Sequence, residues 1–253
     1  MNLVTYDGSF EGLLTAFFEV YEYKIADPFI CKEGIAGGSL FGSVHQANSK
    51  ADKSERVYQR LKEKLSANAL QQLYNVFLSE FKDFENVLFR YVQYVLSNNH
   101  SVERDYGHAD VLLMQQISRK VYREKHRMEA FVRFQCTKDQ LYYSIVQPDY
   151  NVLPLISKHF QTRYADQRWL IYDGLRKYGL YYNLQHTEEV KIDFNIDCNH
   201  EETQHNIFDQ KEELYQSLWR QYFRSVNIKA RKNMKLHIRH MPTRYWKYLV
   251  EKR

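Results

Sequence analysis

The last 35 residues of the chain combine positive charge with aromatic rings. Trp219 to Arg253 holds eleven Lys or Arg residues and one acid, Glu251, which gives +10 (11 − 1). The rest of the chain holds 25 bases and 30 acids, which gives −5 (25 − 30). Cations suit contacts with phosphates, and aromatic rings suit stacking on bases. The segment therefore predicts contact with a polyanion, usually nucleic acid.

Eight cations of this segment are the candidate nucleic-acid ligands. A solvated basic face is the alternative interpretation of such a charge run. Yet +10 within 35 residues costs self-repulsion that a polyanion would relieve. Two of the eight, Arg220 and Arg224, are four residues apart and so share one face of a helix. The candidates are Arg220, Arg224, Lys229, Arg231, Lys232, Lys235, Arg239 and Arg244.

The large aromatics beside these cations have two interpretations. Core anchors are favoured over base-stacking platforms, because large aromatics mostly pack inside. This expectation applies to Trp219, Phe223, Tyr245 and Trp246. A second basic cluster, from Arg119 to Arg127, falls at the end of a predicted helix. The helix dipole is a sufficient local reason for cations there, and the sequence does not show whether the two clusters share a face.

Other residue types could support metal binding or catalysis, but their spacing matches no motif. Asp193 to His205 holds metal-ligand side chains, and we favour a solvated acidic loop without a cofactor. No Gly-x-Ser-x-Gly, His-Glu-x-x-His or Walker sequence is present, so catalytic residues stay unknown. If the protein is an enzyme, the first candidates are Asp166, Asp173, His159 and Arg168.

The elements that must position these residues predict an α+β fold. It has a mainly helical N-terminal half, a small antiparallel sheet and C-terminal helices. We expect a single domain over 1–253, with a division into a mainly helical 1–127 and an α+β 128–253 as the alternative. The predicted helices cover residues 9–23, most of 53–130, 151–164, the stretch from Phe208, and Thr243–Lys252. Single strands are predicted at 2–6 and Val190–Ile196. One predicted hairpin pairs Met128–Cys136 with Gln140–Val146, and a second covers Arg168–Leu184. Residues 31–52 are expected to be a connector.

Composition and cysteine usage predict a soluble cytoplasmic protein. Cys31, Cys136 and Cys198 are isolated, which fits a reducing compartment and forms no zinc pattern. The N-terminus lacks the basic start and apolar run of a signal peptide. No stretch approaches 18 apolar residues, so no membrane contact is expected.

Three stretches carry a resemblance to one bacterial family, and the resemblance extends over nearly the whole chain. They are YDGSFEGLLTAFFEVYE (Tyr6–Glu22), PDYNVLPLISKHFQTRYADQRWLIYD (Pro148–Asp173) and LWRQYFRSVNIKARKNMKLHIRHMPTRYWKYLVE (Leu218–Glu251). The sequence is similar to the DNA metabolism or DNA-repair proteins built on domain-of-unknown-function family 4130. The Met-Pro-x-Arg-Tyr-Trp ending, Met241 to Trp246, is the most specific part.

This resemblance implies a role in DNA damage processing. It implies that family members act as partners of a DNA-repair radical SAM protein. A related domain occurs fused to uracil-DNA-binding proteins of the UdgX type. The resemblance implies no catalytic residues. The leading hypothesis is therefore a DNA-binding accessory protein that acts with a catalytic partner. The alternatives are a nucleic-acid-processing enzyme (a glycosylase, lyase or nuclease) with an unfamiliar site, and a protein-interaction module for the radical SAM partner.

Overall fold

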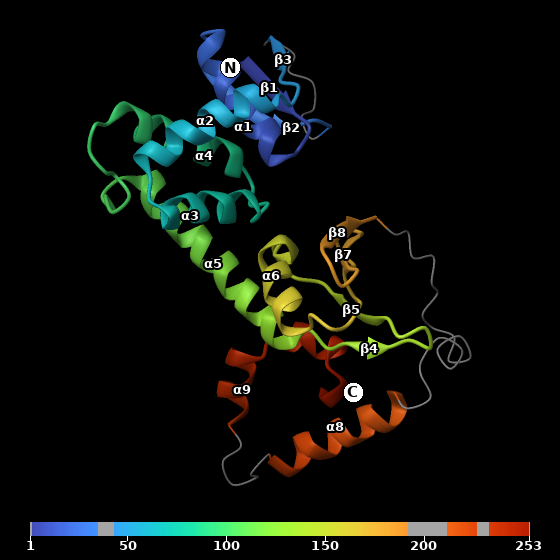
Figure 1. Ribbon diagram of the computed structural model, residues 1–253. Helices are drawn as coiled ribbons and strands as arrows, with labels where there is room; N and C mark the ends of the chain where they lie inside the picture. The colour runs from blue at the N-terminus through green and yellow to red at the C-terminus, as the bar shows by residue number, and fades with distance from the viewer. Residues whose placement is uncertain (1, 35–42, 192–211, 227–232, 253) are drawn as a thin grey trace. The chain divides into compact units, whose positions relative to one another are not determined.

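The computed structural model describes residues 2–34, 43–191, 212–226 and 233–252, and within the helix at 212–226 the side chains of 213 and 223–226 are not described. The chain forms two compact units, Met1–Tyr122 and Arg123–Arg253. Figure 1 labels the elements of each. One helix, α5 (Ala109–Phe131), contributes residues to both units.

The N-terminal unit contains a three-stranded parallel sheet with helices packed on it. The strand order is β2-β1-β3, and β1 pairs in parallel with both neighbours. Ser9 caps the following helix by accepting a hydrogen bond from the Gly12 amide. The strands are β1 (Asn2–Tyr6), β2 (Pro28–Lys32) and β3 (Val44–Gln46), and the helices are α1 (Phe10–Glu22), α2 (Ala51–Lys64), α3 (Ala67–Phe77) and α4 (Phe84–Ser97).

The prediction of a connector over 31–52 was wrong at both ends. Strand β2 reaches Lys32, and β3 lies at Val44–Gln46. Strand β3 has only three residues, and both strands pair with β1, a partner that their own sequences do not reveal. Residues 35–42, between them, lie outside the described residues.

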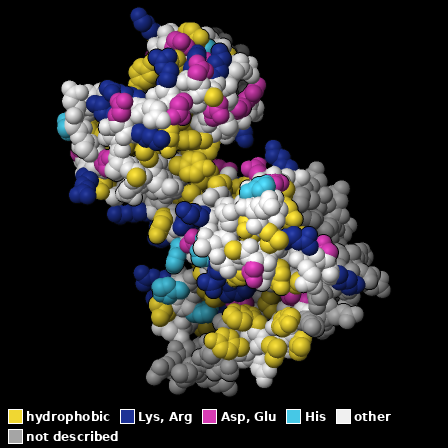
Figure 2. Space-filling model, viewed as in Figure 1, with side chains coloured by type: hydrophobic (Ala, Val, Ile, Leu, Met, Phe, Trp, Pro, Cys, Tyr) yellow, Lys and Arg dark blue, Asp and Glu magenta, His cyan; other side chains and the backbone are white. Residues whose placement is uncertain are grey.

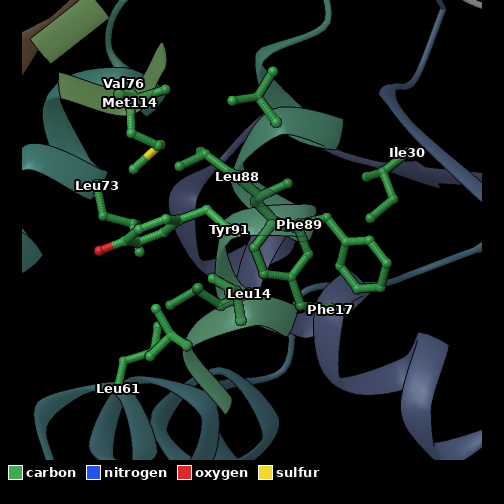
Figure 3. Packing of buried hydrophobic residues seen from close by; sticks show 14 of the residues in the cluster. Leu14, Phe17, Ile30, Leu61, Leu73, Val76, Leu88, Phe89, Tyr91 and Met114 are labelled. Atoms are coloured by element: carbon green, nitrogen blue, oxygen red, sulfur yellow. The ribbon is translucent and has the colours of Figure 1, made fainter. Parts of the chain in front are cut away.

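The core of the N-terminal unit gathers apolar side chains from β1, β2 and the helices of that unit (Figure 3). Phe17 of α1 packs against Phe89 of α4 with ring centroids 5.4 Å apart. Leu61 and Leu73 are fully buried in the same cluster. The helical spacing of these residues in the sequence is thus the spacing of the buried face.

The C-terminal unit is built on a five-stranded sheet in the order β4-β5-β6-β7-β8. The pairs are antiparallel except β5 with β6, which run in parallel because helix α6 crosses between them. The expectation of an antiparallel sheet was therefore wrong for that one pair. The elements are β4 (Gln135–Cys136), β5 (Tyr142–Val146), α6 (Leu153–Arg163), β6 (Trp169–Asp173), β7 (Tyr178–Tyr182) and β8 (Thr187–Val190).

The predicted strand Met128–Cys136 was wrong over its first half. Helix α5 continues to Phe131, and only Gln135–Cys136 pairs with β5. Met128 and Val132 are both buried and lie four residues apart, so a short apolar run here has the helical period. The predicted strand Val190–Ile196 overlaps β8 only at Val190, and its remainder from residue 192 lies outside the described residues.

The C-terminal elements follow the sheet. They are α8 (Glu212–Val226), α9 (Met234–His240) and two 3₁₀ turns, η2 (Thr243–Tyr248) and η3 (Val250–Lys252). The single terminal helix predicted over 243–252 is therefore a pair of 3₁₀ turns after Pro242. The α+β class with small sheets and C-terminal helices is confirmed. None of the helices within the described ranges has the length and apolar character that a membrane span requires.

Candidate functional site

The structure describes the side chains of four of the eight predicted nucleic-acid ligands. Lys235 and Arg239 are exposed on α9, and Arg220 is partly exposed on α8. Arg244 lies in η2 and makes several contacts. Arg224 belongs to α8, but its side chain is not described. Lys229, Arg231 and Lys232 lie outside the described residues.

Arg244 is held by two carboxylates rather than left in solvent. Its guanidinium donates to Glu124 Oε2 at 3.0 Å and approaches Asp149 Oδ2 at 2.7 Å. The Glu124 side chain is only 1% exposed, whereas that of Arg244 is 40% exposed. Arg244 also stacks over the ring of Tyr245 at 4.4 Å. Glu124 and Asp149 therefore largely neutralise the charge of Arg244. This makes Arg244 a weaker candidate for phosphate contact than Lys235 or Arg239.

Tyr245 completes the buried end of this cluster. The ring is 2% exposed, and the hydroxyl donates to Glu124 Oε1. Burial, together with the hydrogen bond and the negative charge of Glu124, raises the pKa of Tyr245 far above its ordinary value. The hydroxyl therefore stays protonated and remains a donor. The expectation that Tyr245 is a core anchor is confirmed.

The two basic clusters meet at Glu124, which the sequence did not reveal. Arg127 donates to Glu124 Oε2 at 3.4 Å, the same oxygen that Arg244 binds. The charges of Arg123 and Arg244 both act on Tyr150, whose pKa is raised mainly by burial. Arg123, Arg127 and Arg244 therefore lie around one point in the C-terminal unit. No sequence signal links them, because Glu124 and Arg244 are 120 residues apart.

The loop after β5 is tied to this point by more cations. Arg176 donates to the carbonyls of Pro148 at 3.1 Å and Asp149 at 3.2 Å. Lys247 donates to Gln147 Oε1 at 2.8 Å. Positive charge thus gathers around the acids of this region from five cations, which are Arg123 and Arg127 of α5, Arg244 and Lys247 of η2, and Arg176 after β6.

A second clamp joins α8 to the chain end. Glu251 is the only acid of the basic segment, and its side chain is 1% exposed. It accepts from Arg133 at 2.8 Å and from Trp219 Nε1 at 2.9 Å. Burial by itself would raise the pKa of Glu251. The hydrogen bond from Arg133 and its positive charge outweigh this effect, so the pKa of Glu251 is lowered. The one acid of the segment is therefore withdrawn from the surface.

Trp219 is exposed despite this hydrogen bond. It is 40% exposed, and on the same helix Tyr215 is 59% and Tyr222 57% exposed. The expectation that Trp219 is a core anchor was therefore wrong. Trp246 is partly buried and donates to the Met241 carbonyl. Phe223 is in α8, and its side chain is not described.

The residues first considered for catalysis are not gathered by the described contacts. Asp173 is fully buried, accepts from the amides of Leu175 and Arg176, and pairs with the Arg176 guanidinium at 2.9 Å, so it builds the β6–β7 turn. His159 lies 3.9 Å from Glu129, and Arg168 donates to the Asp139 carbonyl. Asp166 is exposed.

The metal-ligand types from Asp193 to His205 lie outside the described residues. Across the ranges that are described, no three His, Cys, Asp or Glu side chains form a group that could hold a metal ion.

Comparison of the sequence with known protein families identifies one match. No curated protein and no solved structure matches the chain. The model of a family described as a domain of unknown function, DUF4130, matches residues 82–251. That range is well over half of the chain and includes Glu124, Asp149 and the Met241–Trp246 motif. The chain belongs to the DUF4130 family.

Proposed function

We propose that this protein binds DNA through its C-terminal segment and serves as an accessory protein in bacterial DNA repair or metabolism. It would hold DNA for a catalytic partner, for which the family resemblance suggests a DNA-repair radical SAM protein. The main support for the proposal is which charges of the C-terminal segment are buried and which are exposed. The only acid of the +10 segment is buried against Arg133, while Lys235 and Arg239 are exposed.

The arrangement of those exposed cations supports contact with phosphates. Lys235 and Arg239 are four residues apart on α9 and therefore share a face. No acid in the described ranges pairs with either. Arg123 and Arg127 of α5 add positive charge around Arg244. Exposed cations such as Lys235 and Arg239 attract a polyanion and supply affinity that does not depend on sequence.

Fluorescence anisotropy of labelled duplex DNA across a salt series tests the proposal. If about five cations neutralise phosphates, log affinity falls with log salt at a slope of roughly −4 to −5. The variant Lys235→Glu/Arg239→Glu should bind far more weakly, with a slope shallower by about 2.

The matched control, Lys82→Glu/Arg104→Glu, makes the same charge change at exposed positions of the N-terminal unit. It should retain the wild-type slope. A salt-insensitive interaction, or equal losses in the two variants, would show that α9 is not the site.

A further inference from the structure

Helix α8 carries a continuous apolar stripe that its own unit leaves exposed. Figure 2 shows hydrophobic side chains gathered over this helix. The stripe is Leu214, Tyr215, Leu218, Trp219 and Tyr222, whose exposed fractions range from 40% to 59%. On an ordinary surface helix such a stripe faces the core. A contiguous exposed patch of this kind marks an interaction site.

Three of these five side chains are aromatic rings in a row. Tyr215, Trp219 and Tyr222 stand at i, i+4 and i+7, so they share one face and follow each other by roughly 6 and 4.5 Å along the axis. The rings of Trp219 and Tyr222 lie 5.6 Å apart at 33°. The hydrogen bond from Trp219 Nε1 to Glu251 fixes the middle ring in place. The row is therefore partly preorganised.

The positive charge around the aromatic row favours a polyanion as its binding partner. Trp219 and Tyr222 belong to the +10 segment, and the rest of the stripe directly precedes it. Arg220 follows Trp219 on the flank of the helix. A second copy of the chain would bring two such segments together against their repulsion. Duplex DNA offers phosphates, but its bases are already stacked on one another. A single strand offers both phosphates and free base faces, and base–aromatic stacking tolerates any sequence.

We infer that the aromatic row of α8 stacks unpaired bases, so that the protein prefers single-stranded DNA to duplex DNA. This inference rests on the proposed DNA binding and assigns its strand preference. Phosphates contact described cations of the segment, namely Arg220, Lys235 and Arg239, and bases lie on Tyr215, Trp219 and Tyr222. An apolar protein partner is the competing occupant, and it would bury Leu214 and Leu218 as well as the rings.

The test compares oligo(dT) with a duplex of equal length, using anisotropy at one fixed salt concentration. The variant Tyr215→Leu/Tyr222→Leu keeps an apolar stripe but removes two rings. Stacking energies predict that it binds oligo(dT) about 30-fold or more weakly, while duplex affinity changes by less than about threefold. The control Leu214→Ala/Leu218→Ala removes aliphatic surface and keeps the rings, so it should bind both forms as the wild type does.

Tryptophan emission gives an independent readout. Trp169 is fully buried and Trp246 partly buried, so the part of the quenching by oligo(dT) that is lost in Trp219→Leu comes from Trp219. Quenching as strong in Trp219→Leu as in the wild type would contradict contact between bases and the Trp219 ring. Circular dichroism checks that each variant is folded.

Each further outcome overturns a stated part of the reasoning. Equal losses for single strand and duplex, or no loss in the ring variant, overturn the stacking inference and leave backbone binding standing. A loss in the leucine-to-alanine control as large as in the ring variant assigns the stripe to apolar packing with a protein. No binding of either form at low salt overturns the DNA proposal and the inference together.

Discussion

Neutralising Glu124 should destabilise the C-terminal unit selectively. Glu124 is 1% exposed and accepts hydrogen bonds from Arg244, Tyr245, Arg127 and the Asp149 amide. Glu124→Gln keeps the shape of the side chain but removes the charge that compensates two arginines. Breaking a buried ion pair costs about 3–5 kcal/mol when a charge is left uncompensated. Arg244 keeps Asp149 at 2.7 Å and is 40% exposed, so we expect roughly 2–3 kcal/mol.

The three tryptophans make this measurement specific. Trp169, Trp219 and Trp246 all belong to the C-terminal unit, so their fluorescence follows the unfolding of that unit and not of the other. At about 3 °C per kcal/mol for a unit of this size, the midpoint should fall by roughly 6–9 °C. Circular dichroism of the whole chain should also detect the N-terminal unit.

A carboxylate on the same helix provides the matched control. Glu129 lies 3.8 Å from His126 and 3.9 Å from His159, beyond hydrogen-bond distance, and its side chain is 16% exposed. Its short ion pair is with Lys125, at 2.9 Å within α5. Such an i,i+4 pair is worth about 0.3–0.5 kcal/mol, so Glu129→Gln should shift the midpoint by only about 1 °C. Indistinguishable midpoints for the two variants would refute the view that Glu124 anchors the C-terminal turns.

Two further predictions concern the same unit, and tryptophan fluorescence measures both. The pKa of Glu251 lies below its ordinary 4.5, so its contribution to stability is present above that pH and is lost as pH falls through the lowered value. Glu251→Gln should therefore be less stable near neutrality and lose less stability below about pH 4.5 than the wild type; parallel acid profiles would contradict this. At Gly179 of β7 an added Cβ would lie 3.0 Å from the Ile171 carbonyl oxygen, so Gly179→Ala should cost about 1–3 kcal/mol. At Gly174 the nearest atom belongs to the Gln147 side chain, which can move, so Gly174→Ala should cost less, and the reverse order would be incompatible with a rigid β6–β7 pair.

Local patterns in the sequence predicted many of the elements. The helical spacing of Leu13, Leu14 and Phe17 defines the buried face of α1, because a helix repeats every 3.6 residues whatever it packs against. The β6–β7 hairpin was predicted for the same reason, since both strands and their turn are contiguous. Strands β2 and β3 escaped notice because their stability comes from parallel pairing with β1, which is distant in sequence.

The net charge of the basic segment is a property of the sequence alone, because counting residues gives it without a fold. Which of those charges reach solvent was decided only by tertiary structure. Nothing in the nearby sequence identifies the partners of Arg244 and Glu251, because each is neutralised by a residue about 120 positions away, Glu124 and Arg133. By contrast, Lys235 and Arg239 are exposed, and so is Trp219. Burial of a charge requires a partner, and the partner's position depends on how the whole chain folds.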